Sequence, residues 1–214
     1  MIPGCPDTMA ENALRSSAIE LCQMAEIYQR ELLISSVADT SEYTITPPAN
    51  TRVHKILWAN YDGVDLEPIN TTLLEQRLPK WRESGYGGTP AYFFKGEGNT
   101  VVITPVPTTA SSSGIRLRTV LAPTHASTAL DDDIMNENKD VVVNGALYRL
   151  LRIPGQDFTD FAAAQIYGGL FGQGVVNAER RGRQADTGVS RRTKYGGIYT
   201  SYAKRRNRYG RETA

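Results

Sequence analysis

Residues 179–214 constrain this chain most, because their composition does not allow them to form a hydrophobic core. They hold 11 of the 24 Lys and Arg residues but only three of the 23 acidic residues, which gives them a net charge of +8. Four tyrosines lie among these charges, and no aliphatic residue recurs at the spacing of a helix or a strand. A segment of this kind buries too little apolar surface to fold alone, so we expect it to become ordered on a partner.

Residues 1–178 have the opposite charge, which the overall net charge of +1 conceals. They contain 13 basic and 20 acidic residues, a net charge of −7. A segment of this length can bury a sizeable core, since chains of ~150 residues bury about 70% of their surface. We therefore predict a folded body over residues 1–180 and a basic, tyrosine-rich C-terminal arm over residues 181–214. A solubilising tail without a partner is the alternative interpretation of the arm.

The arm contains the residue types that anchor protein interfaces best, tyrosine and arginine. The candidate binding residues are Arg191, Arg192, Lys194, Tyr195, Tyr199, Tyr202, Lys204, Arg205, Arg206, Arg208 and Tyr209. Nucleic acid is an alternative partner, because basic and aromatic side chains together bind phosphates and bases without sequence preference. Against this alternative, the body is acidic and contains no recognisable nucleic-acid-binding motif.

The first part of the body is predicted to be a helix over residues 9–34. Thr8 and Glu11 form a capping-box pattern at its start. Apolar or small residues then follow at the spacing of one helix face: Leu14, Ala18, Leu21, Ala25, Tyr28 and Leu32. This face packs either within its own domain or against a neighbouring subunit.

A block of short strands is predicted over residues 42–121. Its clearest part is a hairpin in which residues 91–95 and 100–104 flank the turn at 96–99. Further strands are expected at 42–45, 53–60 and 115–121, with a turn at Asp62-Gly63, a short helix over 71–77 and a loop over 105–114. Several short strands joined by turns indicate a small antiparallel sheet or sandwich.

Two helices are predicted after this block. Residues 137–152 place Val143, Leu147, Leu150 and Leu151 on one side, and Pro154-Gly155 ends the pattern. Asp157 or Thr159 is expected to cap a last helix, which carries Phe161, Ala164, Ile166, Tyr167, Leu170 and Phe171 and runs into the arm. The predicted fold class is therefore α+β, with helices grouped around a small antiparallel β-sheet or sandwich insertion and an extended C-terminal arm.

No enzyme class is indicated by the residues that usually carry chemistry. His54 and His125 have no acid or nucleophile at a telling spacing, and the two cysteines form no CxxC pair. Asp131–Asp133 is interpreted as a loop whose acids favour the next helix N-terminus, and the glycines of 168–174 lack the Lys-Ser/Thr of a phosphate loop. We predict no catalytic residue, no cofactor and no metal. No apolar run approaches the ~20 residues of a membrane helix, and the chain starts without a signal-peptide pattern.

Taken in order, these segments resemble the head-to-tail adaptor (connector) proteins of tailed bacteriophages, particularly the short-tailed ones. The resemblance covers about residues 10–180 and depends on the ordered set rather than on one motif. Its segments are Ser41–Pro47, His54–Trp58, Thr72–Arg77, Trp81, Pro90–Phe94, Val101–Pro105, Leu130–Asp133, Asn144–Leu151 and Ala162–Tyr167.

The resemblance implies a structural, non-catalytic protein of the virion neck that is made in the host cytoplasm. It implies a ring of about twelve copies beneath the portal protein, joined to a tail nozzle or tail tube protein. Genomic DNA would pass through the lumen without sequence-specific binding, and no membrane is involved. Because the C-terminal segment of the family reaches the portal, the tyrosines and basic residues of the arm become candidate portal-binding residues.

Overall fold

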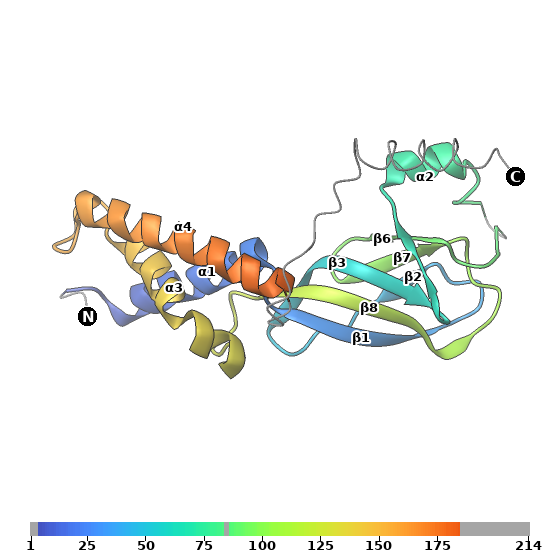
Figure 1. Ribbon diagram of the computed structural model, residues 1–214, viewed down its shortest axis with the longest axis horizontal. Coiled ribbons are helices and arrows are strands. Elements are labelled where there is room, and N and C mark those ends of the chain that lie inside the picture. The colour runs from blue at the N-terminus through green and yellow to red at the C-terminus, as the bar shows by residue number, and fades with distance from the viewer. Residues whose placement is uncertain (1–3, 84–85, 185–214) are drawn as a thin grey trace, which may run out of the picture.

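The computed structural model describes residues 4–83 and 86–184, which form a helical lobe and a sheet lobe at the two ends of an elongated molecule (Figure 1). The helical lobe contains α1 (Asp7–Ala25), α3 (Asp132–Leu150) and α4 (Phe161–Gln184). Eight strands and the short helix α2 (Thr71–Arg77) form the sheet lobe. This arrangement confirms the α+β fold class and the grouping of helices around a β insertion. Of the predicted extended arm, residues 181–184 form the end of α4, and residues 185–214 lie outside the described residues.

Two four-stranded sheets form the sheet lobe. The first has the order β1-β8-β3-β4, with β1 (Gln29–Ser36), β8 (Ser111–Pro123), β3 (Thr51–Tyr61) and β4 (Val64–Asp65) all antiparallel. The second has the order β2-β7-β6-β5, with β2 (Glu42–Thr44), β7 (Thr100–Thr104), β6 (Tyr92–Lys95) and β5 (Glu67–Pro68), of which β5 and β6 are parallel. Both sheets contribute to one core, as expected for a sandwich: Tyr43, Val53, Phe93, Val101, Ile103, Ile115, Leu117 and Leu121.

The prediction of a first helix over 9–34 is wrong beyond Ala25. Glu26 adopts a left-handed conformation with φ 51°, which ends α1, and β1 begins at Gln29. Leu32 lies opposite Leu117 of β8, so the last part of the helical pattern is in fact a strand. Tyr28 is buried in the core of the sheet lobe. The strands consequently run from Gln29 to Pro123, a wider block than the predicted 42–121.

The locally encoded elements of the sheet lobe form as predicted. β6 and β7 make the predicted hairpin, and Asp62 and Gly63 make the turn between β3 and β4 with φ values of 46° and 87°. Asn70 caps α2, because its Oδ1 accepts a hydrogen bond from Leu73 N at 2.7 Å. β8 begins at Ser111, inside the segment predicted to be a loop, because it pairs there with Ser36 of β1.

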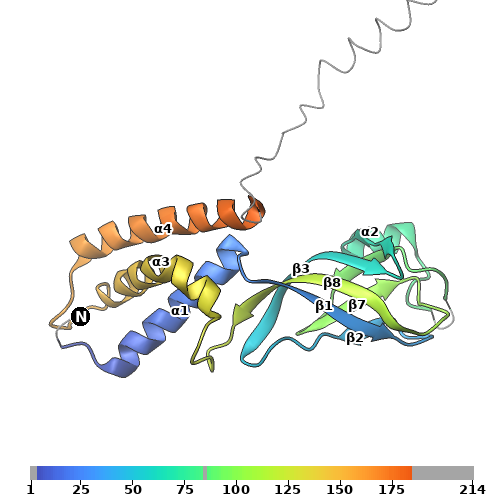
Figure 2. The same cartoon turned by 60° about the horizontal axis from the view of Figure 1, so that its bottom comes forward.

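The three long helices lie side by side, with α3 in contact with both α1 and α4 (Figure 2). α3 begins five residues before the predicted start and buries Val142, Ala146 and Leu150, while Val143 is exposed. The cap of α4 is Asp160, whose Oδ1 accepts from Ala163 N at 2.9 Å, rather than Asp157 or Thr159. Thr159 instead donates to the backbone oxygen of Ile153.

Candidate interaction surfaces

The last turns of α4 are fixed on α3 by a hydrogen bond to a buried side chain. Arg181 Nη2 donates to Asn138 Oδ1 at 2.7 Å, and Asn138 Nδ2 donates to the backbone oxygen of Ile134 at 2.9 Å. A buried amide that loses one partner is costly, so this pair holds the end of α4 in place. The end of α4 lies where the helical lobe meets the sheet lobe (Figure 2).

A small cavity of about 160 Å³ with both polar and apolar lining residues lies beside this hydrogen bond. Asp133 and Glu137 of α3 line it together with Arg181 and Gly182 of α4. Gly182 lies close to the turn after α1, since a Cβ added there would be 3.4 Å from Ile27 Cγ2. Two carboxylates therefore lie at the place where the described chain ends and the basic segment continues.

The eleven candidate residues of the arm, from Arg191 to Tyr209, lie outside the described residues. The structure therefore brings none of them together, and their role in binding stays a prediction. The described part of the chain ends at Gln184, the last residue of α4.

Polar contacts join the two lobes at their junction. Lys55 Nζ of β3 lies 2.7 Å from Glu26 Oε1, just after α1. Arg30 of β1 forms an ion pair with Asp131, just before α3. The hydrogen bond and charge of Asp131 raise the pKa of the Arg30 guanidinium, which keeps it protonated. Such exposed pairs contribute little stability each, about 0–1 kcal/mol, but they fix the orientation of the lobes at several points.

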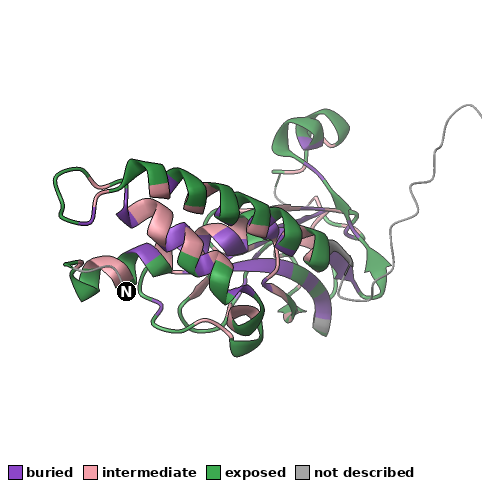
Figure 3. Ribbon diagram, turned by 60° about the vertical axis from the view of Figure 1, so that its left-hand side comes forward, coloured by how far each residue is buried: buried purple, intermediate pink, exposed green. Residues whose placement is uncertain are grey.

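The side of α4 that points away from α1 and α3 contains no charge over most of its length. Residues 161–178 include no Asp, Glu, Lys or Arg. Ile166 is 65% exposed, Val176 is 54% exposed, and Leu170 is also exposed. Figure 3 shows exposed residues along the outer side of the helix. A surface helix normally carries charged residues on its solvent side. This surface, hereafter the α4 outer face, consists of Ile166, Gly169, Leu170, Gly172 and Val176.

The four glycines of residues 168–174 fall into two pairs. A Cβ on Gly168 would lie 2.8 Å from the ring of Tyr148, and a Cβ on Gly174 would lie 2.6 Å from Val141. These two glycines therefore allow α4 to pack closely on α3. A Cβ on Gly169 or Gly172 would meet no other described atom within 4 Å. Nothing within the described fold requires a glycine at either position.

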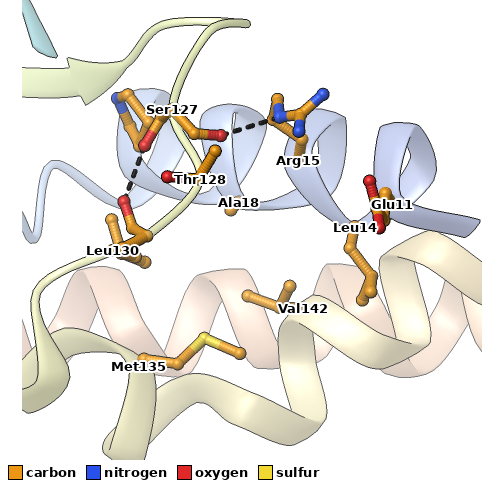
Figure 4. A pocket seen from close by; sticks show the side chains of 11 residues that line it. Glu11, Leu14, Arg15, Ala18, Ser127, Thr128, Leu130, Met135 and Val142 are labelled. Carbon is orange, nitrogen blue, oxygen red and sulfur yellow. Dashed lines mark hydrogen bonds between the residues drawn. The ribbon is translucent and has the colours of Figure 1, made fainter. Parts of the chain in front are cut away.

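On the other side of the helical lobe, α1, α3 and the loop after β8 enclose a cavity of about 370 Å³, hereafter the α1–α3 cavity (Figure 4). Leu14 and Ala18 of α1 and Met135 and Val142 of α3 form its apolar wall. Arg15 at its rim is held by the loop, because its Nε donates to Ser127 O at 2.8 Å. A largely apolar concave surface of this size is typical of a binding site.

The described residues offer little for chemistry. They contain no group of three or more His, Cys, Asp and Glu residues that could hold a metal ion. Partial burial and the charge of Arg52 lower the pKa of His54, which favours its neutral form. Burial raises the pKa of the Cys22 thiol to about 12, so this cysteine stays protonated and unreactive at neutral pH. Among the helices described here, none is long and apolar enough to cross a membrane.

Comparison with protein families gives a match over most of the chain. The family model described as SU10 adaptor protein matches residues 5–193, which include both lobes and the first part of the C-terminal arm. No curated protein matches the chain. The α4 outer face and the α1–α3 cavity, which both lie within the matched residues, were not predicted from the sequence. The uncharged run over residues 161–178 is the signal that could have revealed the first of them.

Proposed function

The chain belongs to the SU10 adaptor protein family, and from this premise we propose that it is a structural protein of the phage virion that joins the DNA-filled head to the tail. The family match over residues 5–193 is the observation on which this proposal rests. The proposed role needs no catalysis, and the buried thiol of Cys22 is protonated at neutral pH.

In the proposed assembly, copies of the chain form a ring beneath the portal protein and contact a tail nozzle or tail tube protein. The acidic body supports the passage of genomic DNA through such a ring. Residues 1–178 carry a net charge of −7. A basic lumen would release counterions from DNA and retain it, whereas an acidic one repels the phosphate backbone.

The arm is proposed to bind the portal protein in an extended conformation. The 30 residues after Gln184 span at most about 100 Å when fully extended, which is enough to cross a neighbouring subunit. Tyr195, Tyr199, Tyr202 and Tyr209 would supply buried apolar area, while the arginines pair with portal carboxylates. Exposed ion pairs contribute little each, so we expect the tyrosines to matter more than any single arginine.

Deletion of residues 185–214 tests the role of the arm, because it leaves α4 and its contact with Asn138 intact. We expect the deleted chain to lose attachment to purified portal rings at physiological salt. A full-length variant with the four tyrosines changed to alanine keeps every arginine and is expected to lose most of the attachment. Undiminished attachment of the deleted chain would contradict the proposal.

Binding of nucleic acid by the arm is the alternative, favoured by the eleven basic residues within 179–214, of which eight follow Gln184. It differs from portal binding in its salt dependence, because binding through phosphates weakens steeply as salt rises. If the deletion abolishes DNA binding but leaves portal attachment unchanged, the alternative is favoured. If attachment to the portal survives physiological salt and depends on the tyrosines, the alternative is excluded.

A further inference from the structure

The helical lobe has two unpartnered apolar surfaces on opposite sides of α3. Val142 of α3 lines the α1–α3 cavity and also packs against Phe171 and Val175 of α4. α3 therefore separates the cavity from α4, and the ribbon of α4 lies behind that of α3 in Figure 4. One surface is convex and uncharged, and the other is concave and apolar.

The convex surface has the composition of an interface core. Interface cores are depleted of charged residues, as residues 161–178 are. Each glycine inside a helix costs about 1 kcal/mol relative to alanine, and Gly169 and Gly172 have no close contact within the described fold that would explain this cost. Glycine allows another backbone to approach closely, so this pair indicates a partner that packs tightly on the α4 outer face.

The charges next to the two surfaces are complementary. Arg180 follows Val176 by one turn of α4 and is exposed on the same side of the helix. Glu11 precedes Leu14 by one turn of α1 and lines the cavity. Neither Glu11 nor Arg180 has an ion-pair partner among the described residues. If α4 of one copy packs antiparallel to α1 of another, Val176 meets Leu14 and Arg180 meets Glu11.

We propose that the α4 outer face of one copy docks into the α1–α3 cavity of the next copy. This inference rests on the proposed function and names the surfaces through which copies would contact one another. A convex and a complementary concave surface on opposite sides of one chain make a head-to-tail contact, and repetition of such a contact gives a closed ring or a filament. Two copies related by a simple two-fold axis would instead use the same surface twice.

The test uses four full-length chains that each gain one glutamate. Val176→Glu changes the α4 outer face and Leu14→Glu changes the cavity. The controls Val64→Glu and Leu73→Glu lie in the sheet lobe. Val64 is 55% exposed and Val176 54%, while Leu73 is 43% exposed and Leu14 38%, so each control matches its test position. Because all four positions are exposed, circular dichroism is expected to show folded protein in every case.

Association between copies is measured by sedimentation velocity on the concentrated free chain and by electron microscopy of chains bound to portal rings. We expect Val176→Glu and Leu14→Glu each to weaken association between copies by more than about tenfold, because each substitution buries an unpaired charge in the contact. The two controls are expected to associate as the wild type does. An equimolar mixture of Val176→Glu and Leu14→Glu should recover pairs, since the first keeps an intact cavity and the second an intact α4 outer face.

Equal association of all four variants, or no recovery in the mixture, would overturn the inference. If Val176→Glu associates normally while Leu14→Glu fails to attach to the portal, the cavity receives a portal segment instead of a second copy. The outcomes also separate this inference from the proposed function. Wild-type chains that associate through these surfaces but never attach to portals would support the contact and contradict the adaptor role. Wild-type chains that attach to portals without contacting one another through these surfaces would support the adaptor role and contradict the proposed contact.

Discussion

Glycine has different roles at different positions of the helical lobe, and the distances around each position show which role applies. A Cβ on Gly145 of α3 would lie 2.1 Å from Ser17 Oγ and 2.7 Å from the ring of Phe171. This glycine allows α1, α3 and α4 to meet, and the substitution of a larger residue forces them apart. Gly169 and Gly172 of α4 have no such contact. Close packing therefore requires glycine at position 145, whereas positions 169 and 172 have room for a larger side chain.

This contrast predicts opposite effects of the same substitution. Gly145→Ala is expected to lower the free energy of unfolding by about 1–3 kcal/mol, because the added methyl group overpacks the centre of the lobe. Gly169→Ala is expected to raise it by up to about 1 kcal/mol, because alanine is the better helix former. Urea unfolding of the two variants beside the wild type measures both effects. A destabilised Gly169→Ala variant would show that the glycine is needed within the monomer.

Cys22 predicts a loss of stability at alkaline pH. Burial raises the pKa of its thiol from 9.0 to about 12 in the folded chain. Above pH 9 the unfolded chain releases this proton and the folded chain keeps it, so stability falls as pH rises towards 12. Between pH 8 and pH 10 the wild type should lose about 1 kcal/mol more than Cys22→Ala, in which this titration is absent. Equal losses in the two proteins would contradict the burial of the thiol.

At the scale of elements, the structure agrees with the local sequence patterns of the sheet lobe but not with the predicted helix caps. The Thr8–Glu11 capping box was wrong, because α1 begins at Asp7 after Pro6 and has no side-chain cap, and α4 is capped by Asp160. The hairpin of β6 and β7 and the turn at Asp62 depend on neighbouring residues, and both were predicted. β1 was missed because residues 29–34 continue the helical spacing of α1. Only the pairing of Leu32 with Leu117, 85 positions away, makes them a strand. Non-local pairing of this kind overrides the local pattern and leaves no signal in the segment itself.

The α4 outer face and the α1–α3 cavity also depend on contacts between distant segments, which a local sequence pattern does not show. The residues of α4 could be assigned to a helix from their spacing, but the exposed side of that helix depends on where α3 lies. The predicted buried side of the helix over 137–152 was right at Leu150 and Leu151 but wrong at Val143, which is exposed while its neighbour Val142 is buried. The cavity could not be predicted, because it forms between α1, α3 and a loop that are joined only by the fold.

The end of α4 gives a prediction at this scale. Arg181→Ala removes the partner of the buried Asn138 and is expected to lower the free energy of unfolding by about 1–3 kcal/mol. Backbone amides near residue 181 should also exchange their hydrogens faster, because the last turns of α4 are no longer held on α3. Arg180→Ala is the matched control, since Arg180 is the exposed neighbour. Equal exchange in the two variants would show that the hydrogen bond does not hold the helix end.

At the scale of the whole molecule, the structure and the charge distribution divide the chain into parts with different tasks. The sheet lobe is closed around its own core, whereas the helical lobe has two uncovered apolar surfaces. The end of α4, from which the proposed basic arm would continue, is held on α3 near the junction of the lobes. In the proposed function, these parts are the ones through which the chain would contact further copies of itself, the portal protein and the tail.

The central claim is that the chain is an adaptor that assembles on a portal. Electron microscopy of the full-length protein, alone and mixed with purified portal rings at physiological salt, tests it most directly. We expect the mixture to show an added ring of density on one end of each portal, in register with the portal axis, whatever the state of the protein alone. Portal rings that stay bare in the presence of excess folded protein would contradict the claim.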